Sequence, residues 1–170
     1  DLPEHLPEAE FVARYGGVYE HSPWVAEQSF AALPEHSGAA ELAAIFAACV
    51  DRADTETQLA LIRAHPDLAG RAAVRGELTA DSTGEQASAG INQCTPEEFR
   101  RFQDFNDRYR KKFGFPFVMA VKNSNRHEIL AAFERRLHND REQELTQAIS
   151  EIHKIARMRL EALFRESNAA

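Results

Sequence analysis

The chain has 170 residues, a length that suits one domain built around one hydrophobic core. Hydrophobic residues make up 44% of the sequence and charged residues 28%, which is the profile of a soluble globular protein. The formal net charge of -7 argues against a nucleic-acid-binding protein, because such a protein needs a basic face to neutralise phosphates. No apolar run approaches the length that spans a bilayer, so we expect no membrane segment.

The ends of the chain and its cysteines bear on the compartment. Residues 1–4 lack the basic and apolar regions of a signal peptide, and residues 167–170 do not match a peroxisomal signal. Cys49 and Cys94 could in principle pair, but two reduced thiols are the simpler expectation. The sequence therefore predicts a cytoplasmic protein.

The first half of the chain contains two predicted helices. Residues 39–50 form an alanine-rich apolar stretch of strong helix formers. Thr55-Glu56-Thr57-Gln58 fits a capping box, in which side chains satisfy the first backbone N–H groups of a helix. This helix should run to about residue 64, because Pro66 disfavours helical geometry at His65.

Start and stop signals delimit two further helices. Ser82-Thr83-Gly84-Glu85 matches a second capping box and predicts a helix to about residue 89, with Gly90 as its stop. Thr95, followed by Pro96 and two acids, is the clearest start signal in the chain. The helix that it opens should end at Gly114. Aromatic residues recur along this helix at helical spacing: Phe99, Phe102, Tyr109 and Phe113.

The last third of the chain is also predicted to be helical, apart from one apolar run. Residues 115–121 could be a strand or a buried extended segment, which periodicity alone does not distinguish. Asn125 opens a helix to about residue 138, and a long helix covers residues 141–164. Strand candidates are too few to form a sheet. We therefore predict an all-α fold, a single-domain helical bundle of about seven to nine helices over residues 1–170.

Arg159 interrupts the apolar face of the final helix. That face follows alternating steps of four and three residues through Leu145, Ile149, Ile152, Ala156, Arg159 and Leu163. A charge on such a face is costly unless it is paired. Arg159 could extend its guanidinium to water or to a surface carboxylate, or it could form an anion clamp inside a cleft. Spacing alone favours the first interpretation.

His65 and Glu85 each allow a structural and a functional interpretation. His65 could be a helix C-terminal histidine stabilised by the helix dipole, or an imidazole that Pro66 holds at a pocket rim for proton transfer. Glu85 could satisfy its capping box, or it could lie beside a helix N-terminus whose amides attract an anionic ligand. The structural interpretation is the simpler one for each residue taken alone.

Motifs for metal or cofactor binding are missing from the sequence. The seven histidines are scattered, and neither His-Glu-x-x-His nor Cys-x-x-Cys occurs, so we predict no metal site. The sequence also lacks a Gly-x-Ser-x-Gly elbow, a phosphate loop and a dinucleotide fingerprint. We therefore expect no nucleotide or redox cofactor.

Five segments stand out in chain order. They are Tyr19-Glu20-His21-Ser22-Pro23-Trp24, then His65-Pro66-Asp67-Leu68-Ala69-Gly70, then Ser82-Thr83-Gly84-Glu85-Gln86-Ala87-Ser88-Ala89-Gly90, then Phe113-Gly114-Phe115-Pro116-Phe117-Val118, and last Arg136-Leu137-His138-Asn139 with Glu144-Leu145 and Arg159-Leu160. Together, in this order and at this spacing, they resemble the 2-oxo-4-hydroxy-4-carboxy-5-ureidoimidazoline (OHCU) decarboxylase family. The resemblance covers nearly the whole chain.

The resemblance implies an all-helical enzyme, usually a homodimer, that releases CO2 from OHCU to leave (S)-allantoin without any cofactor. His65 and Glu85 then correspond to the catalytic acid and base groups, and which of them delivers the stereo-determining proton stays open. The implied substrate-binding residues are Pro66, Ser82, Gln86, Phe117, Val118, Met119 and Arg159. Met119 stands where the family is expected to have a branched aliphatic residue, a change that a backbone contact would survive.

Two alternatives from other classes remain. A non-enzymatic helical adaptor would leave His65, Glu85 and Arg159 scattered and solvated. A related lyase or hydrolase would use the same scaffold on another ureide.

Overall fold

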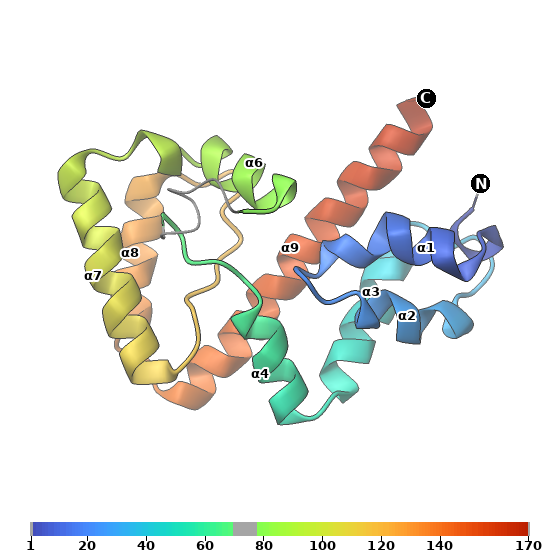
Figure 1. Ribbon diagram of the computed structural model, residues 1–170, viewed down its shortest axis with the longest axis horizontal. Helices are drawn as coiled ribbons and strands as arrows, with labels where there is room; N and C mark the ends of the chain where they lie inside the picture. The colour runs from blue at the N-terminus through green and yellow to red at the C-terminus, as the bar shows by residue number, and fades with distance from the viewer. Residues whose placement is uncertain (1, 70–77, 170) are drawn as a thin grey trace. The chain divides into compact units, whose positions relative to one another are not determined.

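The computed structural model describes residues 2–69 and 78–169, and all regular structure within these ranges is helical (Figure 1). The described residues form eight α-helices and four short 3-10 helices, and no strand occurs among them. The all-α prediction is therefore confirmed. Gly70, which ends the His-Pro-Asp-Leu-Ala-Gly segment, and Ala170 lie outside the described residues.

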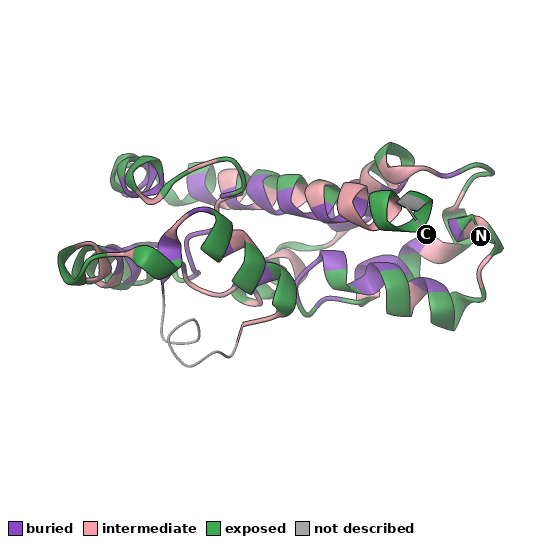
Figure 2. Cartoon of the chain, turned by 90° about the horizontal axis from the view of Figure 1, so that it is seen from above, coloured by how far each residue is buried: buried purple, intermediate pink, exposed green. Residues whose placement is uncertain are grey.

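The chain forms two compact units. One unit consists of residues Asp1–Ala64 and Ile152–Ala170, and the other consists of residues His65–Glu151. The last helix, α9 (Arg141–Ala169), is divided between the two units at Glu151. Figure 2 shows buried and exposed residues alternating along α9, as expected for a helix that buries one face.

The first unit packs helices around a core of aromatic and aliphatic side chains. Its helices before α9 are α1 (Glu8–Tyr15), α2 (Trp24–Ser29), α3 (Ala39–Arg52) and α4 (Thr55–Arg63). A 3-10 helix at Pro3–His5 precedes α1, and two more, Gly16–Val18 and Phe30–Ala32, follow α1 and α2. Phe11 and Phe46 are fully buried at its centre, with ring centroids 6.2 Å apart.

The second unit packs three helices and the start of α9 around a larger aromatic cluster. The helices are α6 (Ala80–Ser88), α7 (Pro96–Phe113) and α8 (Arg126–Arg136), with a 3-10 helix at Ile91–Gln93. Tyr109 of α7 contacts Phe113, Phe117 and Phe133, and the last two rings are stacked with centroids 3.9 Å apart. Three residues of the predicted aromatic stripe of α7, Phe102, Tyr109 and Phe113, are thus buried in the core of this unit, whereas Phe99 is only partly buried.

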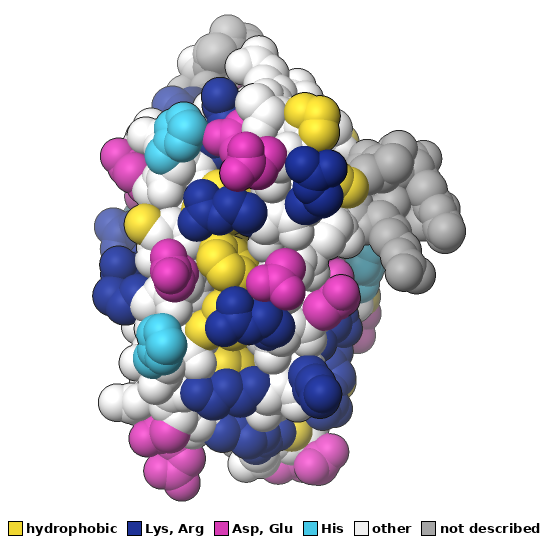
Figure 3. Space-filling model, turned by 90° about the vertical axis from the view of Figure 1, so that its left-hand side faces the viewer, with side chains coloured by type: hydrophobic (Ala, Val, Ile, Leu, Met, Phe, Trp, Pro, Cys, Tyr) yellow, Lys and Arg dark blue, Asp and Glu magenta, His cyan; other side chains and the backbone are white. Residues whose placement is uncertain are grey.

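The outer side of α7 is charged. Figure 3 looks onto this end of the second unit and shows Lys and Arg side chains interspersed with Asp and Glu. Arg108 and Asp104, one turn apart on α7, form one such pair at 3.4 Å. No helix among the described residues is both long and apolar enough to cross a membrane.

Most predicted helix ends are confirmed, but two predicted caps are wrong. The cap of α4 is Asp54, whose side chain accepts from the Thr57 N–H, so Thr55 is the first helical residue. The cap of α6 is Thr79, which bonds the Ser82 N–H, so this helix begins at Ala80 and not at Ser82. Both sequences contain several cap-forming residues in a row, and the four-residue pattern does not decide which of them leaves helical geometry.

The apolar run at residues 115–121 is not a strand. It is an extended trace without ladder partners among the described residues, and it links α7 to the turn before α8 (Figure 1). Phe115, Phe117 and Val118 are buried, as in the second of the two predicted alternatives. Gly114, with a φ of 80°, ends α7 and starts this segment.

Candidate functional site

His65 lies just after α4, at the start of the second unit. The helix ends at Arg63, and His65 is only 5% exposed. Pro66 follows and fixes the backbone direction. The imidazole is therefore buried in a non-helical segment, unlike the solvated side chain that an adaptor would carry.

Gln86 of α6 holds the backbone that follows Pro66. Its Oε1 accepts from the Ala69 N–H at 3.2 Å, and its Nε2 donates to the Asp67 carbonyl at 3.4 Å. Arg110 of α7 adds an ion pair with the Asp67 carboxylate at 3.1 Å. The predicted site residue Gln86 is thus engaged with the segment that carries His65.

Two more amides, both on α7, fix the same segment. Asn106 donates to the Leu68 carbonyl at 2.9 Å, and Gln103 donates to the Ala69 carbonyl at 2.6 Å. Ala69 has a φ of 51°, a conformation that non-glycine residues rarely adopt. The surrounding hydrogen bonds hold this unfavourable conformation, so the backbone next to His65 has one defined position.

α6 presents three predicted site residues together. Ser82 and Gln86 lie one turn apart on the buried side of the helix, and Glu85 is partly exposed beside them. Because Thr79 caps this helix, Glu85 lies well inside α6 and has no capping-box role. Neither the capping box nor the place beside a helix N-terminus that the sequence suggested for Glu85 is therefore correct.

Side chains from α8 and α9 anchor the extended segment on both sides of Met119. Arg136 Nη1 donates to the Val118 carbonyl at 2.8 Å. The Ala120 N–H donates to Glu151 Oε1 at 3.1 Å. Met119 itself is partly exposed, and its backbone N–H and C=O have no hydrogen-bond partner among the described residues. These two backbone groups can therefore bind a ligand.

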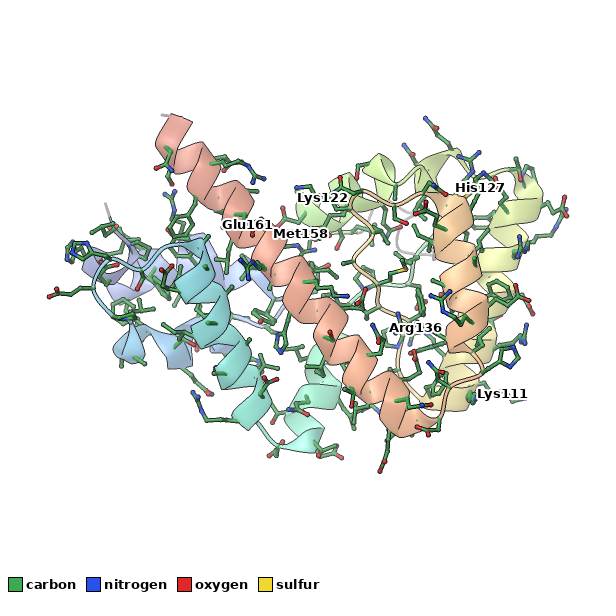
Figure 4. The ribbon with its side chains drawn as sticks, turned by 180° about the vertical axis from the view of Figure 1, so that it is seen from behind. Lys111, Lys122, His127, Arg136, Met158 and Glu161 are labelled. Carbon is green, nitrogen blue, oxygen red and sulfur yellow. The ribbon has the colours of Figure 1, made fainter. Side chains whose placement is uncertain are left out.

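Arg136 belongs to a buried polar network within the second unit. Its Nε donates to Glu144 Oε1 at 2.8 Å, and its guanidinium lies 4.2 Å from the centroid of the Phe117 ring. Glu144 is fully buried and also accepts from Tyr109 Oη at 2.5 Å and Asn139 Nδ2 at 3.0 Å. In Figure 4, Arg136 lies between α8 and the segment of residues 115–121.

α7 contacts two of the three segments that carry predicted site residues in the second unit. Gln103 and Asn106 hold the backbone after His65, and the Tyr109 ring contacts that of Phe117 at 5.4 Å between centroids. The segment after His65 and the segment that contains Phe117 therefore pack on one helix, while the third segment is α6 itself.

A cavity of about 500 Å³ lies next to Gln86 in the second unit. Apolar side chains such as Ile91 and Phe99 form most of its lining, and Gln86 and Asn92 are among the polar ones. In the described part of the chain, no group of three or more His, Cys, Asp or Glu side chains could hold a metal ion.

Comparison with known proteins identifies the family. The model of the OHCU decarboxylase family matches residues 4–161. A 2-oxo-4-hydroxy-4-carboxy-5-ureidoimidazoline decarboxylase of Haloferax volcanii is 43% identical over 159 residues, which are 94% of this chain and 92% of the relative. The chain belongs to the OHCU decarboxylase family.

Two further matches agree with this assignment. The decarboxylase of the same name from Halalkalicoccus jeotgali is 44% identical over 90% of this chain and 84% of its own length. A crystal structure of an (S)-allantoin synthase superimposes with a TM-score of 0.73 at 34% identity, over 95% of this chain and 52% of that one. This chain thus shares the fold of about half of that (S)-allantoin synthase chain.

Arg159 lies in the first unit, where it is buried. Its Nη1 is 3.1 Å from Glu20 Oε1 and 3.5 Å from the Val18 carbonyl, and Glu20 is only 2% exposed. The expectation of an exposed guanidinium is therefore wrong, because the carboxylate that pairs with Arg159 is itself buried.

The residues that anchor the extended segment were not predicted from the sequence. Arg136, Glu144 and Glu151 are buried charges that were not among the predicted site residues, although Arg136 and Glu144 lie in the last of the five family-like segments. A signal was nevertheless available, because Ile129, Phe133 and Arg136 follow steps of four and three along α8. The same rule that singled out Arg159 would have found Arg136.

Proposed function

We propose that this protein decarboxylates OHCU to (S)-allantoin and CO2, with His65 and Glu85 as its acid and base groups. Family membership over residues 4–161 supports the reaction. The observation that carries the residue assignment is the buried His65, which lies on a backbone held by Gln86, Gln103 and Asn106. A rigidly held imidazole of this kind suits directed proton transfer.

The reaction needs no external electron sink. OHCU has a ring carbon that bears a hydroxyl and a carboxylate, next to a C=N bond whose carbon carries the ureido group. When the C–C bond to the carboxylate breaks, CO2 leaves and its electron pair moves through the ring into the C=N bond, whose nitrogen takes a proton. The resulting enol then loses its hydroxyl proton, and the ureido-bearing carbon gains one. One proton is consumed overall, and its delivery to one face gives (S)-allantoin.

The protein therefore has to orient the substrate, place charge and direct a proton. His65 acts on the side of the carboxylate and hydroxyl. Glu85 holds the hydroxyl or a ring N–H and fixes the reactive conformer. One of these two residues protonates the ureido-bearing carbon.

The remaining predicted site residues bind the substrate. Ser82 and Gln86 donate hydrogen bonds to ureido or ring carbonyls, and Arg159 binds a carbonyl oxygen and stabilises developing negative charge. The backbone N–H and C=O of Met119 offer a donor and an acceptor side by side, which suits a urea-type group. Pro66, Phe117 and Val118 supply the apolar packing around it.

A time course of circular dichroism tests the reaction. OHCU is generated in situ from urate with urate oxidase and hydroxyisourate hydrolase, with and without this protein. Because spontaneous decay gives racemic allantoin, we expect rapid growth of an (S)-allantoin signal only with the protein. If OHCU decays at the uncatalysed rate to an optically silent product while the protein is demonstrably folded, the proposal is refuted. The non-enzymatic helical adaptor would then be the favoured interpretation.

We also infer a homodimer in the cytoplasm, acting as one decarboxylase domain over residues 1–170. The family resemblance supports the homodimer, and the family match to residues of both units supports the single domain. Cys49 and Cys94 are both free thiols, which supports a reducing compartment. Light scattering after gel filtration would test the dimer, and a monomeric mass at micromolar concentration would refute it.

A further inference from the structure

We propose that Arg136 is a positioning residue for substrate binding, which together with Glu151 fixes the backbone groups of Met119. This inference rests on the proposed function, in which residues 117–119 contact the substrate. Neither Arg136 nor Glu151 was among the residues that the sequence assigned to the site.

Hydrogen bonds on both sides of Met119 determine the direction of its backbone groups. In an extended chain, the N–H and C=O of one residue point to the same side, and the preceding C=O and following N–H point to the opposite side. The Val118 carbonyl bonds Arg136 at 2.8 Å, and the Ala120 N–H bonds Glu151 at 3.1 Å. These two anchors bracket Met119, and an extended backbone there turns its own N–H and C=O to the side opposite the Arg136 and Glu151 atoms.

The ion pair between Arg136 and Glu144 requires both charges to lose their hydration. Arg136 is 6% exposed and Glu144 is 0% exposed, so both ions are removed from water. A buried ion pair is weak evidence for a contribution to stability, because apolar residues of similar volume often replace such a pair without loss. An apolar residue at position 136 could not, however, bond the Val118 carbonyl. Holding that carbonyl is the property that requires a guanidinium here.

Contacts on two sides hold the guanidinium of Arg136 in place. Glu144 binds its Nε, and the Phe117 ring lies against the guanidinium plane at 4.2 Å from its centroid. Tyr109 and Asn139 in turn hold Glu144 through hydrogen bonds of 2.5 and 3.0 Å. The guanidinium therefore has one orientation, and the Val118 carbonyl follows it.

The test compares Arg136→Lys with Arg126→Lys. Lysine keeps the charge but is a point donor, so it cannot bond Glu144 and the Val118 carbonyl with the fixed fork of arginine. Arg126 is a matched control, because it lies on the same helix and bonds Glu98 at 2.9 Å, and it has no hydrogen bond with residues 115–121 in the described part of the chain. Initial rates with OHCU generated in situ give kcat and KM for each variant.

We expect Arg136→Lys to raise KM by about tenfold, because a contact that binds the ground state and the transition state equally is lost. Arg126→Lys should leave KM unchanged. A merely structural role would lower the amount of folded enzyme, and hence the apparent kcat, without changing KM. The second anchor gives an independent pair of variants. Glu151→Ala should raise KM, and Glu151→Gln should restore it, because an amide oxygen can still accept from the Ala120 N–H.

The outcomes separate this inference from the function on which it rests. Wild-type protein that does not accelerate the formation of (S)-allantoin would refute the proposed function, and this inference with it. Active wild-type protein together with wild-type KM values for folded Arg136→Lys or for Glu151→Ala would refute the positioning role alone.

Discussion

Arg159 and Glu20 form a buried ion pair across 139 residues of sequence, with 3.1 Å between Nη1 and Oε1. The exposed fractions of the two side chains are 4% and 2%, so neither charge can be solvated by water in place of its partner. The pair ties α9 to the segment that follows α1, both within the first unit. It also sets the direction of the guanidinium that we assign to substrate binding.

Glu20→Ala should lower the free energy of unfolding by about 3–5 kcal/mol, because it leaves the Arg159 charge buried without its carboxylate. Urea denaturation followed by circular dichroism measures this change. Glu161→Ala is the matched control, since it breaks an exposed pair with Arg157 that is also 3.1 Å long. The control should cost no more than about 0.5 kcal/mol. Equal effects of the two substitutions would contradict the assignment of a buried ion pair.

His65→Ala and Glu85→Ala should each lower kcat by a factor of about 10² to 10⁴, the usual worth of general acid or base catalysis. The circular dichroism time course also separates their roles. The variant that has lost the stereo-determining proton donor should give racemic allantoin from whatever substrate it still decarboxylates. His127→Ala is the control, because that side chain is 70% exposed on α8. Full activity with intact stereochemistry in either site variant would remove that residue from the mechanism.

Local signals in the sequence predicted most of the fold. Thr95 with Pro96, Asn125 and Gly114 each determine a helix end through their own side chain or backbone, and all three act as predicted. The caps at Asp54 and Thr79 were missed because neighbouring polar residues compete for that place. Tertiary packing decides which of these polar residues caps the helix, and a four-residue sequence pattern carries no information about that packing.

Periodicity alone singled out one candidate site residue, the one that violates its local pattern, and the family resemblance supplied the others. Arg159 was singled out because it interrupts an apolar face, and the structure buries it. Its partner Glu20 could not be foreseen, since the pair forms only when distant helices meet. The amides of Gln103 and Asn106 were also beyond prediction. They bind backbone carbonyls of a segment more than thirty residues away, and no periodicity indicates such contacts.

The stability of the protein should fall at alkaline pH, in part through Tyr109. Burial, and then the hydrogen bond to Glu144, raise the pKa of Tyr109 well above its ordinary value of 10.0. The unfolded chain therefore loses this proton first. The contribution of Tyr109 to the free energy of unfolding is therefore fully present below about pH 10, and it is lost as the pH rises toward the pKa of Tyr109 in the folded protein. Urea unfolding on both sides of about pH 10 measures the slope.

Tyr109→Phe should lower the unfolding free energy at neutral pH by about 1.5–3 kcal/mol, because a hydrogen bond to a charged acceptor is lost. Above about pH 10 the variant should lose stability less steeply than wild type, by up to about 1.4 kcal/mol per pH unit. Burial also raises the pKa of Tyr19 and of Tyr15, so part of the slope should persist in the variant. Parallel pH profiles for the two proteins would contradict the linkage to Tyr109.

Gly84 and Gly114 provide a matched pair of substitutions, because an added Cβ would meet no described atom within 4 Å at either position. They differ only in their backbone. Gly84 lies inside α6, where Gly84→Ala should raise the unfolding free energy by about 0.5–1 kcal/mol through lower entropy of the unfolded chain. Gly114 has a φ of 80°, so Gly114→Ala should lower it by about 1–2 kcal/mol. Urea unfolding compares both variants with wild type. Shifts of the same sign would mean that the conformation of α6 or of the turn after α7 differs from the one described, since available space alone cannot distinguish the two glycines.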